Sequence, residues 1–350
     1  MNQKFITIGE IMLRLTPPNY EKIRVTHSFE ASYGGAEANI ALALANLGVD
    51  SSFFTVVPDN SIGKSAIRML RSNDVHCSSI ILSTPEQTPT HRLGTYYLET
   101  GFGIRPSQVT YDRKHSAFSE YDYSDYDLRN LLSEYTWLHM SGITPALSEN
   151  LKKLTLDSLK IAKELGLIVS FDGNFRSTLW SWEEARDYCT ECLPYVDVLL
   201  GIEPYHLWRD ETNHYKGDWK DDISLQPAYK EQDEIFQKFV ERYPNIKVIG
   251  RHVRYAHSGS ENSLKAYLWM GGKTYESKLF RFTILDRVGG GDAFASGLIY
   301  ALMKEFSPED TINFAVASSA IKHTIRGDAN ITDSEATIRN LMNMNYDIQR

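Results

Sequence analysis

The chain has 350 residues, of which 42% are hydrophobic and 23% charged, and its formal net charge is −8. This composition is typical of a globular protein with a large core, and the negative charge excludes a general attraction to nucleic acid or to anionic membranes. No segment has about 18 consecutive apolar residues, and no signal-peptide pattern is present. Three cysteines argue against a disulfide framework, so we expect a cytoplasmic protein.

The first part of the chain alternates predicted strands and helices. Residues 5–13 are rich in β-forming side chains and predict a buried first strand, and residues 34–49 begin with two glycines and predict a helix. Residues 51–57 predict a second strand. Residues 61–75 have apolar side chains at helical spacing and predict a second helix. This order favours a parallel sheet covered by helices.

Two segments interrupt this alternation, at about 11–35 and about 86–115. The second contains THRLGTYYLETGFGIRPSQVTYDR, which is aromatic, rich in β-forming residues and punctuated by glycines. We expect the two segments to form an antiparallel β excursion that could cover a binding site.

The alternation then resumes as far as the C-terminal third. Strands are predicted at 137–142, 167–174, 196–202 and 246–250, and helices at 148–166 and around 309–325. A polar, irregular stretch at 208–233 predicts a surface insertion.

The stretch ILDRVGGGDAFASGLIYALMKE (284–305) is the strongest chemical signal. Three consecutive glycines, Gly289, Gly290 and Gly291, cost conformational entropy on folding and precede a predicted helix. The amides at a helix N-terminus form a site suited to phosphate, which a glycine backbone leaves accessible. Asp292 would repel a phosphate, but it could take a proton from a hydroxyl that attacks one. The alternative is that Asp292 only caps the helix and the glycines only form a turn.

Two motifs carry a resemblance to a known family. DRVGGGDAFASGL resembles the C-terminal signature of the ribokinase-like (PfkB) sugar kinases, and GGAEANIALALANLG resembles their N-terminal signature. Segments 137–148, 170–186 and 320–330 resemble the 2-keto-3-deoxygluconate kinases within that family. The resemblance covers nearly the whole chain. It implies phosphorylation of 2-keto-3-deoxygluconate by ATP at its 6-hydroxyl.

The resemblance also implies a fold and partners. We expect a three-layer α/β/α sandwich with a mainly parallel central sheet and a small β-sheet lid. The chain would be a single kinase domain, 1–350, with the lid formed by about 11–35 and 86–115. Lids of this type commonly meet across a dimer, so a homo-oligomer is expected, with a sugar acid and ATP as its small-molecule partners and Mg²⁺ as cofactor. A monovalent cation is a further candidate.

Individual roles follow from the matched motifs. Asp292 would be the catalytic base, and Gly289, Gly290 and Gly291 the anion hole. Asp286 corresponds to a position associated with the nucleotide and the monovalent cation, and Ser258 and Gly259 are assigned to the nucleotide. The sugar would contact Glu10, Gly34, Gly35, Asn39, Tyr111 with Tyr97 or its neighbour Tyr96, Arg113 and Arg176. The two arginines would hold the carboxylate of the substrate, because a guanidinium matches its two oxygens.

Two departures from the family pattern leave questions open. Gly201 stands where an asparagine tied to Mg²⁺ is expected, with only Glu203 nearby, so no metal ligand is assigned. The usual G-x-K-G motif is replaced by RHVRYAHSGSENSL (251–264). The alternatives are another sugar kinase of this fold, such as a fructokinase or ribokinase, and a sugar-binding sensor without catalysis. A nicotinamide-dependent dehydrogenase is disfavoured, since no G-x-G-x-x-G follows the first strand.

Overall fold

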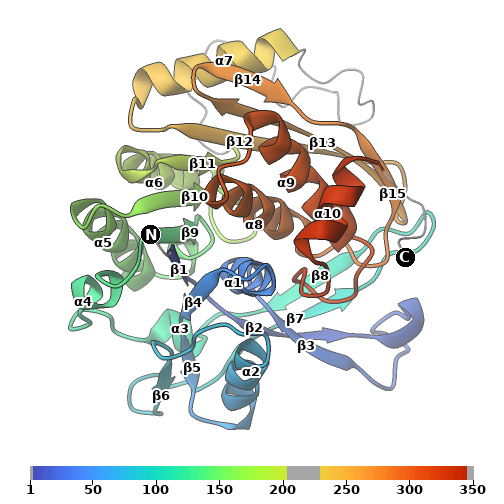
Figure 1. Cartoon of the computed structure of the whole chain (residues 1–350). Coiled ribbons are helices and arrows are strands. Elements are labelled where there is room, and N and C mark those ends of the chain that lie inside the picture. Colours follow the sequence, from blue (N-terminus) through green and yellow to red (C-terminus); the bar gives the residue numbers. More distant parts are fainter. Residues whose placement is uncertain (1–2, 203–228, 345–350) are drawn as a thin grey trace.

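The structure is a computed structural model, and it describes residues 3–202 and 229–344. Glu203 and residues 208–228 of the predicted insertion therefore lie outside the described residues. Within the described ranges, the chain forms one large sheet, a small four-stranded sheet and a two-stranded sheet, with helices on both faces of the large one (Figure 1).

The large sheet has the order β14-β13-β12-β11-β10-β9-β1-β4, and β15 pairs with β13. Pairing is parallel from β4 to β12 and antiparallel beyond. Apolar side chains fill the parallel strands because helices cover both faces. The strands are β1 (Lys4–Ile8), β4 (Asp50–Phe54), β9 (Trp137–Ser141), β10 (Ile168–Asp172), β11 (Val198–Leu200), β12 (Val248–Ala256), β13 (Glu261–Met270), β14 (Lys273–Glu276) and β15 (Phe280–Thr283).

The helices form two layers. One layer comprises α1 (Ala36–Asn46), α8 (Gly290–Met303), α9 (Pro308–Lys322) and α10 (Glu335–Met342), and the other α5 (Glu149–Glu164), α6 (Trp182–Cys192) and α7 (Tyr229–Arg242) (Figure 1). Each layer packs on the sheet through its own hydrophobic core. Phe294 and Leu298 of α8 belong to the core of the first layer, and Phe236 and Phe239 of α7 belong to the core of the second. Of the remaining helices, α3 (Ala117–Glu120) and α4 (Leu128–Leu132) share the core of α5, α6 and α7, and α2 (Ser61–Arg71) belongs to a third, smaller core.

The small sheet has the order β3-β2-β7-β8, with β2 (Met12–Thr16), β3 (Glu30–Gly34), β7 (Gly94–Glu99) and β8 (Gln108–Asp112). The expected α/β fold with a small second sheet is confirmed. The expected antiparallel pairing is right for β2–β3 and β7–β8, but β2 and β7 are parallel. That residues 1–350 form a single domain stays a prediction.

Two predicted strands are each two strands. Residues 5–13 divide at Gly9, after which the chain leaves the large sheet for the small one; a Cβ on Gly9 would lie 2.4 Å from a carboxylate oxygen of Glu37. Residues 51–57 divide into β4 and β5 (Val56–Pro58), and β5 pairs with β6 (Ile81–Ser83). Apolar composition alone did not show these changes of sheet.

Two general expectations concern the rest of the described chain. No helix in residues 3–202 and 229–344 combines the length and apolarity that crossing a bilayer requires. The three cysteines, Cys77, Cys189 and Cys192, are buried and unpaired, as expected without a disulfide framework.

Candidate active site

A cavity of about 580 Å³ opens at the carboxyl ends of the parallel strands. Glu10 follows β1, Asp172 ends β10 and Gly201 follows β11, while Tyr96 and Tyr111 reach the cavity from the small sheet. The start of α8 completes the wall. This edge is where open α/β sheets bind their ligands, because loops and helix N-termini converge there.

The three glycines at the start of α8 have different structural reasons. Gly289 has a φ of +79°, and a Cβ there would lie 1.7 Å from the carbonyl oxygen of Asp328. A Cβ on Gly290 would lie 2.3 Å from the ring of His323. Only Gly291 has open space beside it, with the nearest atom, Cε1 of His252, at 3.8 Å. Packing therefore requires the first two glycines, and access for a ligand accounts for the third.

The amides at this helix start are available to a ligand. The first turn of a helix leaves its N–H groups without intrahelical partners. No side chain caps α8, and no carbonyl of the described residues outside the helix accepts from Gly290 or Gly291. With the positive end of the helix dipole, these amides form a site suited to an anion.

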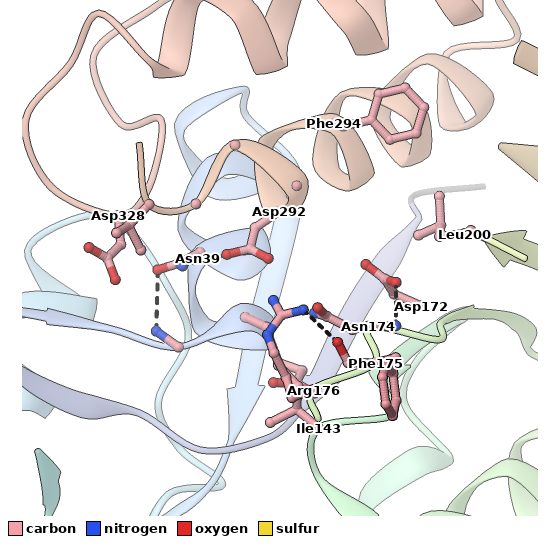
Figure 2. A pocket seen from close by; sticks show the side chains of 18 of the residues that line it. Asn39, Ile143, Asp172, Asn174, Phe175, Arg176, Leu200, Asp292, Phe294 and Asp328 are labelled. Carbon is pink, nitrogen blue, oxygen red and sulfur yellow. Dashed lines mark hydrogen bonds between the residues drawn. The ribbon is translucent and has the colours of Figure 1, made fainter. Parts of the chain in front are cut away.

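Asp292 lies in the first turn of α8 and faces the cavity (Figure 2). Gly289, not Asp292, is the N-cap residue, so the helix-cap alternative is wrong. The carboxylate of Asp292 accepts a hydrogen bond from Nδ2 of Asn39 at 2.7 Å. Burial, with the charges of Asp172 and Asp328, raises the pKa of Asp292 to about 7 against the opposing effects of Asn39 and Arg176. A carboxylate that titrates near neutral pH suits a general base.

Arg176 projects into the same cavity, between Asp292 and Asp172 (Figure 2). Its guanidinium donates to the carbonyl of Phe175 at 3.1 Å, and it forms no ion pair with any described residue. Burial raises the pKa of Asp172 to about 6, while the amide of Asn174 and the charge of Arg176 oppose this shift. Arg176 is therefore a cation available to an anionic ligand.

Arg113 also lies on the cavity, but it is paired. Its Nε donates to Oε2 of Glu10 at 2.9 Å, and both side chains are buried. The other carboxylate oxygen of Glu10, Oε1, is buried without a hydrogen-bond partner among the described residues. The pair thus presents an unused acceptor, suited to a sugar hydroxyl, rather than a free guanidinium.

The structure brings most of the predicted residues to this cavity and leaves five off its wall. On the wall are Glu10, Gly35, Asn39, Tyr111, Arg113, Arg176, Gly289, Gly290, Gly291 and Asp292. Off it are Gly34, Tyr97, Ser258, Gly259 and Asp286. Asp286 is buried in an ion pair with Arg14.

Of the two neighbouring tyrosines, Tyr96 lies on the cavity wall and Tyr97 does not. Side chains alternate along a strand, and in β7 the buried residues are Gly94, Tyr96 and Leu98. Tyr97 instead packs edge-on against Phe29, with ring centroids 5.9 Å apart.

Three other residues that lie off the cavity wall, Gly34, Ser258 and Gly259, contact other parts of the chain. A Cβ on Gly34 would lie 2.2 Å from a carboxylate oxygen of Asp328. The amide of Gly259 donates to the carbonyl of Gly103 at 2.7 Å, and the carbonyl of Ser258 accepts from Arg287 at 3.2 Å. Nucleotide contacts by residues 258 and 259 therefore find no support in this geometry.

The motif comparison did not single out three arginines on the wall: Arg251, Arg254 and Arg287. Burial, followed by the neighbouring charge of Arg254, lowers the pKa of Arg287. Neither Arg254 nor Arg287 pairs with a carboxylate of a described residue, so they form a local positive field. The sequence did contain a signal for them, because Arg251 and Arg254 directly follow the strand predicted at 246–250 and Arg287 shortly precedes the three glycines, in a chain that is acidic as a whole.

Comparisons with known proteins show the family of the chain. A model of the family described as pfkB family carbohydrate kinase matches residues 2–204 and 233–335. A 2-dehydro-3-deoxygalactonokinase from Haloferax volcanii is 30% identical over 350 residues, 100% of both chains. A 2-dehydro-3-deoxygluconokinase from Bacillus subtilis is 26% identical over 92% of this chain and 90% of its own. The crystal structure of a 2-dehydro-3-deoxygluconokinase from Thermotoga maritima is 37% identical, with a TM-score of 0.87 over 97% of this chain and 99% of that one.

Proposed function

Because the chain belongs to the pfkB family of carbohydrate kinases, we propose that it phosphorylates 2-keto-3-deoxygluconate. In this reaction the γ-phosphoryl group of ATP moves to the 6-hydroxyl, giving 2-keto-3-deoxy-6-phosphogluconate and ADP. Similarity to the Thermotoga maritima and Bacillus subtilis kinases that act on this sugar acid supports the substrate.

The observation that carries the proposal is the presence of Asp292 and Arg176 on the wall of one cavity. Asp292 supplies a base beside free helix amides, and Arg176 supplies a cation for the carboxylate end of the substrate. A neutral sugar would offer this arginine only hydroxyl groups, whereas a sugar acid offers it a carboxylate. Binding the acid end remotely fixes the reacting hydroxyl next to Asp292, which lowers the entropic part of the barrier.

The chain's own residues then perform the transfer. Asp292 accepts the proton of the 6-hydroxyl as the oxygen attacks the γ-phosphorus. The amides of Gly290 and Gly291 stabilise charge on the transferred group, as fixed dipoles in a pre-formed site do. Arg254 and Arg287 hold phosphate oxygens of ATP. The bond to the β-phosphate oxygen breaks, and ADP leaves.

Mg²⁺ is expected to accompany ATP rather than occupy a site made by protein ligands alone. Among the described residues, no group of three or more His, Cys, Asp or Glu side chains could hold a metal ion. Mg²⁺ usually keeps several waters and binds through phosphates and one or two carboxylates, and the cavity offers it Asp172 besides the base Asp292. When bound, it neutralises charge on the β- and γ-phosphates.

The C4 epimer of the substrate is a second candidate, since the Haloferax volcanii relative is named for 2-dehydro-3-deoxygalactonate. A coupled assay for ADP release, run with both epimers, fructose, ribose and no sugar, decides between them. We expect turnover with one or both sugar acids. Arg176→Ala should lower kcat/KM for the acid about 10- to 100-fold, the effect of a charged hydrogen bond, and leave fructose unaffected. Preference for a neutral sugar, or no turnover with any sugar, would contradict the proposal.

The exposed surface of the lid supports the proposal that the chain forms a homo-oligomer. Its outer strand β8 is exposed along its whole length, and several large apolar side chains of the lid segments are exposed: Val25, Phe29, Phe102, Ile104, Val109 and Tyr111. An uncovered edge strand flanked by apolar side chains suits pairing with another copy. A cytoplasmic location remains a prediction.

A further inference from the structure

Two cations and two carboxylates are buried together behind the glycine loop. Arg14 comes from β2 of the lid, Lys322 from the last residue of α9, and Asp286 and Asp328 from the loops that follow β15 and α9. Lys322 is 0% exposed and Arg14, Asp286 and Asp328 are 4%, 3% and 4% exposed. Counting each group in its charged form, the cluster is neutral. Buried charges persist only when they are compensated in this way.

Both oxygens of the Asp286 carboxylate accept hydrogen bonds. Its Oδ2 accepts from Arg14 at 2.5 Å and from the amide of Gly327 at 3.1 Å. Its Oδ1 accepts from the amide of Val288 at 3.2 Å. Asp286 thereby fixes the segment that leads directly into the anion-binding turn.

Lys322 occupies the main-chain oxygens of the same region. Its Nζ donates to the carbonyl of Asp286 at 3.3 Å and to that of Ile325 at 3.4 Å. An ammonium group held by backbone carbonyls beside a carboxylate uses the same oxygen ligands that a hard metal cation would require.

A monovalent cation, which the family resemblance suggested for Asp286, does not fit this arrangement. The oxygens that could coordinate it already accept hydrogen bonds from Arg14, Lys322 and two amides. Because the cluster is already neutral, a further cation would leave a net positive charge buried there. Arg14 is held further by Asp328, whose Oδ1 lies 2.5 Å from NH1.

We propose that Lys322, together with Arg14, permanently replaces a monovalent cation behind the anion-binding loop. Both act as positioning residues: they hold Asp286, which accepts from the amide of Val288, and Arg14 also holds Asp328, which packs against Gly289. The enzyme therefore needs no K⁺ or Na⁺ for folding or turnover. The proposed function is required only for the turnover measurement.

The wild-type chain is tested first, with thermal unfolding and ADP release measured in equal concentrations of KCl, NaCl and tetramethylammonium chloride. The expected result is the same unfolding midpoint and the same rate in all three salts. A midpoint or a rate that K⁺ raises above its value in tetramethylammonium would overturn the proposal. Unfolding answers the question even if no sugar is phosphorylated, so failure of the proposed function is distinguishable.

Lys322→Met and Lys322→Gln provide the second test. Each removes one buried positive charge and leaves two carbonyls and a net negative cluster, into which a dehydrated K⁺ or NH₄⁺ can bind. We expect both variants to be destabilised in tetramethylammonium, with K⁺ raising the folded fraction at a fixed denaturing temperature about tenfold or more. Lys153→Met, at an exposed lysine on α5, should match the wild type in every salt. Variants equally impaired in all salts would show that Lys322 only fills space.

Discussion

Replacing Asp292 by asparagine removes the proposed base while preserving its shape. The amide oxygen of asparagine can still accept the hydrogen bond that Asn39 donates at 2.7 Å, so the start of α8 should keep its position. General-base catalysis contributes about 10²–10⁴-fold, which corresponds to about 2.7–5.5 kcal/mol of transition-state stabilisation. We expect kcat to fall by this factor, with KM for the sugar acid changed little.

The pH profile gives a more specific signature of the base. With the pKa of Asp292 raised to about 7, chiefly by burial, half of the wild-type molecules have a charged base at pH 7 and roughly one tenth at pH 6. Wild-type kcat should therefore rise about tenfold per pH unit below 7 and level off above it. In Asp292→Asn this acidic limb should disappear.

Thermal unfolding separates loss of chemistry from loss of fold. A carboxyl group whose pKa is raised in the folded state stabilises the fold below its unfolded pKa of 3.8, and this contribution is lost as the pH rises through about 7. Asparagine has no charge to bury, so Asp292→Asn should unfold at an equal or higher temperature than the wild type at pH 8. The assay is ADP release from pH 5.5 to 9 with unfolding in the same buffers. A kcat close to the wild-type value, or an unchanged acidic limb, would refute the base role.

Three further predictions follow from the site and the lid. Gly291→Ala should cut kcat at an unchanged unfolding temperature, because its Cβ would enter the open anion site. Gly290→Ala should instead lower the unfolding temperature, because its Cβ would lie 2.3 Å from the His323 ring. The opposite pattern would exchange the roles of the two glycines. Arg254→Ala should raise KM for ATP about 10- to 100-fold and leave KM for the sugar unchanged, as steady-state kinetics would show. Ile104→Glu, at a side chain 99% exposed on the lid, should shift the mass measured by light scattering towards the monomer; a monomeric wild type would contradict an interface through the lid.

Local sequence patterns predicted the elements of the fold well but not the changes of sheet. The strand–helix order and apolar runs indicated the large sheet, and the glycine-aspartate stretch indicated the start of α8. At Gly9, where the chain leaves the large sheet, Glu37 of α1 leaves no room for a side chain, and nothing within residues 5–13 contains that information.

The candidate site shows the same division. Asp292 and Arg176 stand in recognisable motifs, and the structure places both on the cavity wall. The pairing of Arg113 with Glu10 joins positions 103 residues apart, and that of Arg14 with Asp328 joins positions 314 apart. Single side chains at such separations carry no periodic signal, so their partners emerge only from the folded chain.

The anchoring of Arg14 limits how the mouth of the enzyme can open. An outward movement of the whole small sheet would separate Arg14 from the two buried carboxylates of Asp286 and Asp328. Leaving one such buried charge without its partner destabilises the structure by about 3–5 kcal/mol. The end of β8 is held in the same way, because Arg113 directly follows it and is paired with Glu10 in a buried ion pair. We therefore expect sugar to enter and leave with β2 and the end of β8 in place, while the floor beneath the phosphates stays still.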